Sequence, residues 1–221
     1  PLQDSASITL RGGRDLIALG SERLVGMRYG PNLPQPFDGA RVLAETGRFR
    51  LDLFALRPVQ VGPDNFDDRT SNVRKISGAY LTARLGGGAS VDVYWLHYRN
   101  DRATFGGVTG AERRETYGMR LFGKRGRWAW NWETMIQRGQ FAGSAIRAWS
   151  QATETSLSFP TLHFKPRLRL RANIASGDSR PGDGRLGTFN AMFPKGKYFG
   201  ELSPIGPRNI VNLHPSVDLD L

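Results

Sequence analysis

Apolar and polar side chains alternate with a period of two along most of this chain. The clearest runs lie at residues 48–55, 79–85, 91–95, 116–121 and 128–133. Successive side chains of a β-strand point to opposite faces of the sheet, so this period predicts strands with one apolar and one polar face. Periods typical of amphipathic helices are hard to find. The pattern therefore indicates an all-β fold.

The alternating segments and the turn residues between them predict an antiparallel meander of ten strands. These strands are expected at residues 6–17, 37–45, 48–58, 74–85, 89–99, 113–123, 127–137, 145–157, 166–176 and 213–221. Nothing in the composition marks an internal boundary, so residues 1–221 are expected to form a single domain.

The predicted connections are of two kinds, which alternate almost strictly. Short turns are predicted at 46–47, 86–88 and 123–126. Long connections are predicted at 18–36, 59–73, 100–112, 138–144 and 177–212. Outer-membrane barrels have short periplasmic turns and long extracellular loops, whereas a soluble sandwich has no reason to sort its loops in this way. The segment 158–165 is an exception, since it is long for a periplasmic turn.

The segment RLRLRANI at 167–174 shows why alternation alone leaves the orientation open. Its three arginines share one face, and its leucines share the other. In a soluble β-sandwich or a lipocalin-like module that binds an anionic ligand, the apolar face would pack in a core. In an up-and-down transmembrane β-barrel, the apolar face would contact lipid and the arginines would line the lumen.

Three tryptophans, Trp128, Trp130 and Trp132, share one face of a strand that begins directly after a tight turn. Tryptophan at strand ends is typical of the aromatic girdle at a bilayer interface. A soluble aromatic core explains the same pattern equally well.

Composition favours anionic partners and argues against several functions. The 221 residues carry a net charge of +11, with a pI near 10.6. There is no apolar run of the ~18 residues that a membrane-spanning helix needs, and there is no cysteine. The histidines His97, His163 and His214 lack the spacing of metal ligands, and no nucleophile elbow or Walker loop is present. We therefore expect no cofactor and no enzyme. Nucleic acid is disfavoured because the basic residues are spread along the strands.

Four stretches of the chain form a characteristic series: GSERLVGMRYGPNLPQPFDGARV at 20–42, RFRLDLFALRPV at 48–59, RANIASGD at 171–178 and GTFNAMFPKGKYFG at 187–200. In this order they resemble the alginate export family of outer-membrane β-barrels from Gram-negative bacteria. The resemblance implies a monomeric barrel of about eighteen antiparallel strands in the outer membrane, of which ten would be roughly half. It implies an anionic solute or an acidic uronate polysaccharide as the permeant. It leaves room for periplasmic export or assembly proteins as partners.

Both ends of the sequence suggest a piece of a longer chain. The first residues, PLQDSASITL, contain no Met, and the last, SVDLDL, stop within an alternating pattern. Barrels of this kind usually end in an aromatic residue, whereas this sequence ends in Leu221. A fragment is therefore expected.

The resemblance and the alternation together predict a lumen lined by arginines and some acids. The predicted lining residues are Arg50, Asp52, Arg84, Asp92, Arg120, Glu133, Arg147, Arg167, Arg169 and Arg171. Arginine stays charged when crowded and pairs with carboxylates in bidentate fashion, so a ladder of moderate sites suits an anionic polymer. The acids are expected to hold some arginines in place. A salt-bridge network that merely fills the barrel remains the alternative for any single arginine.

The sequence leaves the role of three further features undecided. Tyr80, Tyr94 and Tyr98 could offer aromatic surfaces to sugar rings, and the long loop 18–36 could fold inward as a constriction. The glycine-rich segment 177–187 carries Asp178 and Asp183 but lacks the ligand series of a calcium loop, so it is interpreted as an extracellular loop.

Overall fold

The computed structural model describes residues 6–27, 34–64, 66–195 and 206–220. All regular structure in these residues is β-structure, and they contain no helix that is long and apolar enough to cross a bilayer. The strands are β1 (Ser7–Leu16), β2 (Pro36–Glu45), β3 (Phe49–Gln60), β4 (Arg69–Thr70), β5 (Arg74–Gly86), β6 (Ala89–Phe105), β7 (Val108–Arg125), β8 (Trp128–Phe141), β9 (Ser144–Ser158), β10 (Arg167–Ala175), β11 (Arg185–Leu186) and β12 (Ile210–Asp218).

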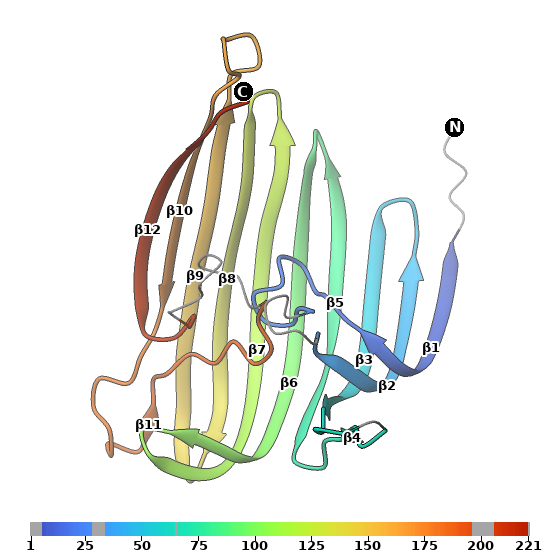
Figure 1. Ribbon diagram of the computed structural model, residues 1–221, viewed down its shortest axis with the longest axis vertical. Coiled ribbons are helices and arrows are strands. Elements are labelled where there is room, and N and C mark those ends of the chain that lie inside the picture. Colours follow the sequence, from blue (N-terminus) through green and yellow to red (C-terminus); the bar gives the residue numbers. More distant parts are fainter. Residues whose placement is uncertain (1–5, 28–33, 65, 196–205, 221) are drawn as a thin grey trace.

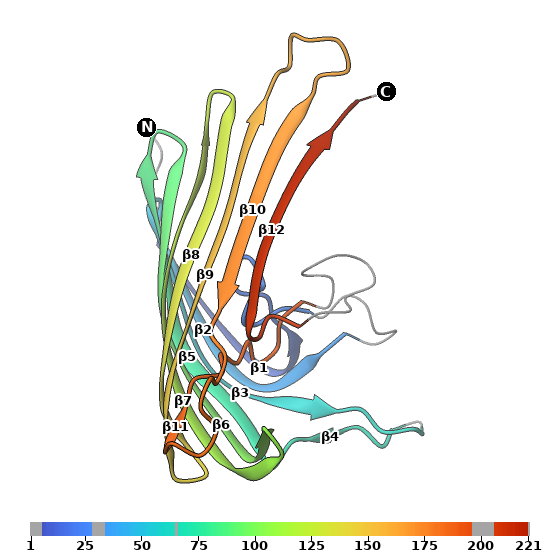
Figure 2. The ribbon, with the colours of Figure 1, turned by 90° about the vertical axis from the view of Figure 1, so that its left-hand side faces the viewer.

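The ten long strands form one sheet in chain order, β1-β2-β3-β5-β6-β7-β8-β9-β10-β12 (Figure 1). Each pairs with its neighbours in antiparallel register, while the short β4 and β11 pair with β3 and β9 outside this order. The sheet is open, with β1 and β12 at its edges, and Figure 2 shows it as a strongly curved wall. The predicted up-and-down meander of ten strands is thus confirmed as part of a barrel wall.

Two of the connections predicted to be long are two-residue turns. β6 and β7 run on to Gly106-Gly107, and β8 and β9 run on to Ala142-Gly143. All four residues have positive φ, as tight hairpin turns of the primed types require. The prediction of long loops at 100–112 and 138–144 was wrong because these segments continue the strands instead.

The predicted separation of short turns at one end of the sheet from long connections at the other is present in part. We call the end that carries the turns 46–48, 87–88 and 126–127 the turn end, and it also carries the longer segment 159–166. We call the opposite end, at the bottom of Figure 1, the loop end. The long connections 17–35, 61–73 and 176–209 all join strands at the loop end.

The convex face of the sheet is apolar and exposed. Leu168 and Leu170 are 46% and 47% exposed, and Trp128 and Trp132 are 53% and 42% exposed. Further exposed apolar side chains on this face are Ile8, Leu10, Phe49, Leu53, Leu81, Val93, Trp95, Tyr117, Met119, Ile136, Trp149, Val211, Leu213 and Val217. The described strands form one sheet, with no second sheet over this surface. The described residues therefore do not form a sandwich in which these side chains are the core.

The concave face is covered at mid-height by two chain segments (Figure 2). We call residues 17–27 the N-terminal strap and residues 186–195 the C-terminal strap. They join through a parallel bridge between Val25 and Phe193, whose main chains are bonded by Gly26 N–H to Phe193 O at 2.9 Å and Phe193 N–H to Leu24 O at 2.9 Å. The inward fold considered for loop 18–36 is thus present in its described part.

The buried apolar residues lie between the straps and the wall. Phe193 packs edge-on against Phe37 of β2, with ring centroids 5.0 Å apart, and against Tyr98 of β6 at 5.8 Å. Ile17, Val25 and Phe193 are each at most 1% exposed. Burial of this size explains why segments so far apart in the chain stay fixed on the wall.

Candidate functional site: the concave wall and its straps

Nine of the ten predicted lining residues share the concave face, and Arg147 does not. In β9 the buried Ile146 and Ala148 point inward, so Arg147 lies on the convex face beside the exposed Trp149. The prediction for Arg147 was wrong for a physical reason. Near the loop end the concave positions of β9 are covered, since Leu186 of β11 pairs alongside Ile146 and both side chains belong to the buried apolar core.

Asp92 of β6 organises the wall toward the turn end. Its carboxylate is 1% exposed and accepts hydrogen bonds from Tyr80 Oη at 2.7 Å, Thr82 Oγ1 at 2.7 Å and Arg120 Nη1 at 2.9 Å. The Arg120 guanidinium also lies 3.9 Å from the ring centroid of Phe122. These contacts hold Arg120 in one orientation, as predicted for the lining acids.

Glu133 of β8 attaches the N-terminal strap to the wall. One carboxylate oxygen accepts from Ser21 Oγ at 2.7 Å and from Arg23 Nη1 at 2.6 Å, both in the strap. The other accepts from Tyr94 Oη at 2.7 Å. Glu133 is 4% and Arg23 8% exposed, so this is a buried ion pair that depends on its additional hydrogen bonds.

A second buried network holds the C-terminal strap. Arg114 of β7 is fully buried and donates to Glu112 Oε1 at 2.6 Å and to Gln137 Oε1 at 2.8 Å. In the strap, Asn190 donates its main-chain N–H to Gln137 at 2.9 Å and its side-chain amide to Glu112 at 3.1 Å. The sequence did not single out this cluster, because its partners lie on segments far apart in the chain.

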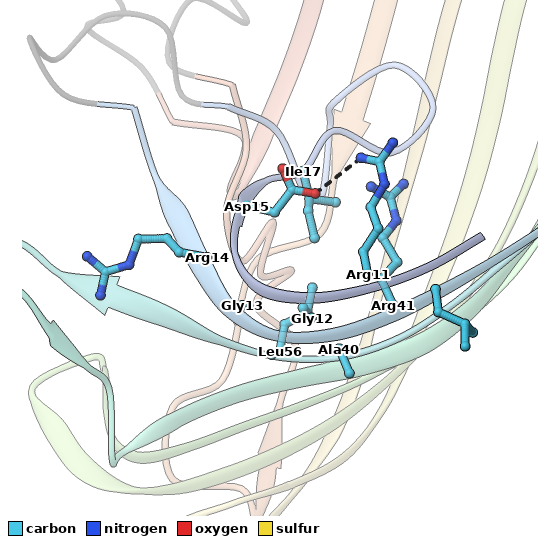
Figure 3. Close-up of a pocket in the computed structure, with 11 residues that line it drawn as sticks. Arg11, Gly12, Gly13, Arg14, Asp15, Ile17, Ala40, Arg41 and Leu56 are labelled. Carbon is cyan, nitrogen blue, oxygen red and sulfur yellow. Dashed lines mark hydrogen bonds and ion pairs between the residues drawn. The ribbon is translucent and has the colours of Figure 1, made fainter.

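Two more inward cations were missed near the β1 edge. Arg11 of β1 and Arg41 of β2 are cross-strand partners whose side chains lie side by side over the concave face (Figure 3). Arg41 is buried and binds the carboxylate of Asp52 through both Nε and Nη2. Arg11 is exposed and lies 3.4 Å from Asp15. The glycines at 12 and 13 interrupt the alternation that would have revealed this strand face.

The arginines of β10 form a ladder up the concave wall toward the turn end. Arg171 Nε lies 2.8 Å from Glu154 Oε2. Arg169 bridges two acids, with Nε 3.5 Å from Glu154 and Nη2 2.7 Å from Asp218. Arg167 donates to Ser158 Oγ at 3.2 Å. All three are partly or fully exposed, so their guanidinium groups remain accessible to a solute in front of the wall.

Two other predicted arginines also lie exposed near the turn end. Arg50 of β3 pairs loosely with Glu45 at 3.1 Å, and Arg84 of β5 donates to the main-chain oxygen of Gly47 at 2.9 Å. A hollow of about 230 Å³ separates the N-terminal strap from this part of the wall, and its lining includes Arg41, Arg50 and Arg120. The concave surface therefore combines buried, fixed ion pairs with exposed cations around an open space.

The three predicted sugar-stacking tyrosines are buried instead. Tyr80 and Tyr94 stack face to face with centroids 4.9 Å apart, and they are 6% and 4% exposed. Tyr98 is 4% exposed beneath the C-terminal strap. Because their rings fill the space between strap and wall, they offer no free aromatic surface to a sugar.

The glycine-rich connection near the loop end makes local turns. Asp178 and Asp183 accept main-chain hydrogen bonds from Arg180 at 3.3 Å and Arg185 at 2.9 Å. Within the described residues, no three His, Asp or Glu side chains lie close enough together to hold a metal ion. The predicted motif residues Tyr198, Phe199 and Gly200, and the final Leu221, lie outside the described residues.

Comparison with known proteins agrees with this architecture. The alginate export family model matches residues 2–221, which is nearly the entire chain. No curated protein and no solved structure gave a significant match. This is a transport family of outer-membrane β-barrels, and an all-β curved wall with an apolar outer face fits it. The chain therefore belongs to the alginate export family.

Proposed function

We propose that this chain forms part of the wall of an outer-membrane channel that passes anionic solutes or an acidic uronate polysaccharide. In this proposal the convex face contacts lipid, and the arginines of the concave face line the path. The lining consists of Arg50, Arg84, Arg120, Arg167, Arg169 and Arg171, with Arg11 and Arg41 added from β1 and β2.

The proposal rests on how apolar and charged side chains are distributed between the two faces of the sheet. Large apolar residues are exposed on the convex face, while acids such as Asp92 and Glu133 are buried on the concave face. In water an apolar surface of this extent is unfavourable, whereas in a bilayer it is the lowest-energy arrangement. Charged groups then gather on the side that remains hydrated.

The β10 ladder suits passage rather than tight retention of an anion. Each of its arginines already shares a protein oxygen, from Glu154, Asp218 or Ser158. A passing carboxylate would compete with these partners, so each site would be moderate in affinity and could hand the anion to the next. The straps narrow the concave side and would direct the solute along the arginines toward the turn end.

Ion selectivity in planar bilayers tests the proposal. Arg169→Glu and Arg171→Glu place negative charge on the ladder, so we expect the channel's preference for anions over cations to fall or reverse. Arg147→Glu is the matched control, since the same charge change on the convex face should leave selectivity unaltered. An unchanged anion preference in the ladder variants would show that these arginines only fill the barrel as structural ion pairs.

A further inference from the structure

A row of positive charges crosses the convex face near the loop end. Lys75 of β5, Arg99 of β6 and Arg113 of β7 face outward and are direct cross-strand partners, Lys75 with Arg99 and Arg99 with Arg113. Like charges directly opposite each other destabilise a sheet. Arg99 is paired with Asp101 at 2.7 Å, and Asp101 also attracts Lys75 and Arg113 electrostatically, so one carboxylate faces three cations. The row therefore keeps an excess of positive charge.

A hollow of about 580 Å³ adjoins this row on the convex face. Its lining includes the small residues Ala55 and Ser77, the cations Arg57, Lys75 and Arg99, and one acid, Asp38. Asp38 is the cross-strand partner of Arg57, and its carboxylate accepts hydrogen bonds from Arg14 Nε at 2.8 Å and Nη2 at 3.1 Å. We call this hollow and the row of Lys75, Arg99 and Arg113 the outer basic groove. Its lining combines small side chains, over which an acyl chain fits, with guanidinium groups that pair with phosphate in bidentate fashion.

The groove lies at the depth expected for lipid headgroups. From Arg99 the strand β6 runs ten residues to its start at Ala89, beside the turn end. At about 3.3 Å per residue and a tilt near 40°, that distance is about 25 Å along the membrane normal, which is the height of the apolar band in such barrels. Between these two levels the outward residues of β6 include Val91, Val93 and Trp95.

The loop end decides which leaflet is involved. Long connections leave the sheet at this end, and in outer-membrane barrels the long loops are extracellular. From this placement, which rests on the proposed outer-membrane location, we propose that the outer basic groove binds the phosphate groups of a phosphorylated glycolipid in the outer leaflet. The lipid phosphates would neutralise the row of like charges and fix the wall at a defined depth.

Lipid binding to the purified protein in neutral detergent tests this proposal without any measurement of conduction. Diphosphorylated lipid A is the probe, and native mass spectrometry and the shift in Tm are the readouts. We expect a bound adduct and a raised Tm with the wild type. The variant K75Q/R99Q/R113Q should bind on the order of a hundredfold more weakly, since each cation near an anionic lipid surface contributes to affinity. The variant R48Q/R125Q/R127Q removes as many charges at the turn end and should bind like the wild type.

Three outcomes would overturn the proposal. They are equal binding by the wild type and K75Q/R99Q/R113Q, equal binding of lipid A from which the phosphates have been removed, and equal or tighter binding of phosphatidylglycerol. Without lipid, K75Q/R99Q/R113Q should be about as stable as the wild type, because the relief of repulsion offsets the loss of the exposed Arg99–Asp101 pair; a clearly lower Tm would also contradict the account. Loss of lipid binding with intact anion selectivity, or the reverse, separates failure of this proposal from failure of the proposed function.

Discussion

The convex and concave faces come from the same strands and carry opposite chemistry. On β10, Leu168 and Leu170 are exposed on the convex side, while Arg169 and Arg171 lie on the concave side. On β6, Val93 is 50% exposed, whereas the adjacent Asp92 and Tyr94 are buried under the N-terminal strap. This wall therefore presents an apolar surface on one side, which fits a lipid environment, and buried ion pairs on the other.

Removal of a buried acid should have the largest effect on the concave face. Glu133→Gln removes a buried carboxylate that lies 2.6 Å from Arg23 and accepts hydrogen bonds from Ser21 and Tyr94, so we expect the free energy of unfolding to fall by about 3–5 kcal/mol. Glu45→Gln is the control, because Glu45 and Arg50 form an exposed pair, for which a loss of at most about 1 kcal/mol is expected. Urea unfolding in lipid vesicles measures both. Similar losses of unfolding free energy in the two variants would contradict the expectation that the buried ion pair stabilises the fold more than the exposed one.

The free-energy cost of a charge on the convex face should depend on its depth in the bilayer. Val93 lies midway between the groove level and the turn end, so Val93→Arg should cost about 2–4 kcal/mol in a bilayer. Ser77→Arg on the same face lies beside the basic row, near the headgroups, and should cost at most about 1 kcal/mol. Equal costs in the same vesicle assay would show that the convex face does not lie in hydrocarbon.

The smallest effect is expected where the N-terminal strap touches the wall. Gly20 has φ +54°, and a Cβ there would lie 2.2 Å from Tyr80 Oη. Gly20→Ala should therefore cost about 1–2 kcal/mol in backbone strain and also lift the strap. Gly87 also has a positive φ, +59°, but open space surrounds it, so Gly87→Ala measures the effect of backbone strain without a steric clash. Hydrogen exchange at the Leu19 amide should speed up in the first variant alone; equal exchange rates would refute the contact.

Strand positions and face chemistry followed from the sequence because they depend on local alternation. All ten predicted strands are present, and nine of the ten residues predicted to line the lumen share the concave face. Arg147 was assigned to the wrong face because both sets of alternating positions in β9 contain apolar residues: Ile146 lies beneath the C-terminal strap, and Trp149 lies on the convex face. The charge of Arg147 alone could not decide which set faces inward.

The straps could not be predicted because their stability comes from contacts distant in the chain. Residues 17–27 and 186–195 show no regular period, yet they bury Val25 and Phe193 against each other. The hairpin at 142–143 was hidden for a local reason. Its first turn residue is Ala142, which adopts the positive φ that usually marks glycine.

Lipid contact by the convex face is the central claim, and spin labelling in lipid vesicles tests it most directly. The chain has no cysteine, so a single label can be placed at Leu170→Cys or at Arg169→Cys. We predict that the label at 170 collides readily with oxygen, which concentrates in hydrocarbon, and little with a water-soluble nickel chelate. The label at 169 should show the reverse. A label at 170 that is fully accessible to the nickel chelate, or one shielded from both reagents, would contradict the account.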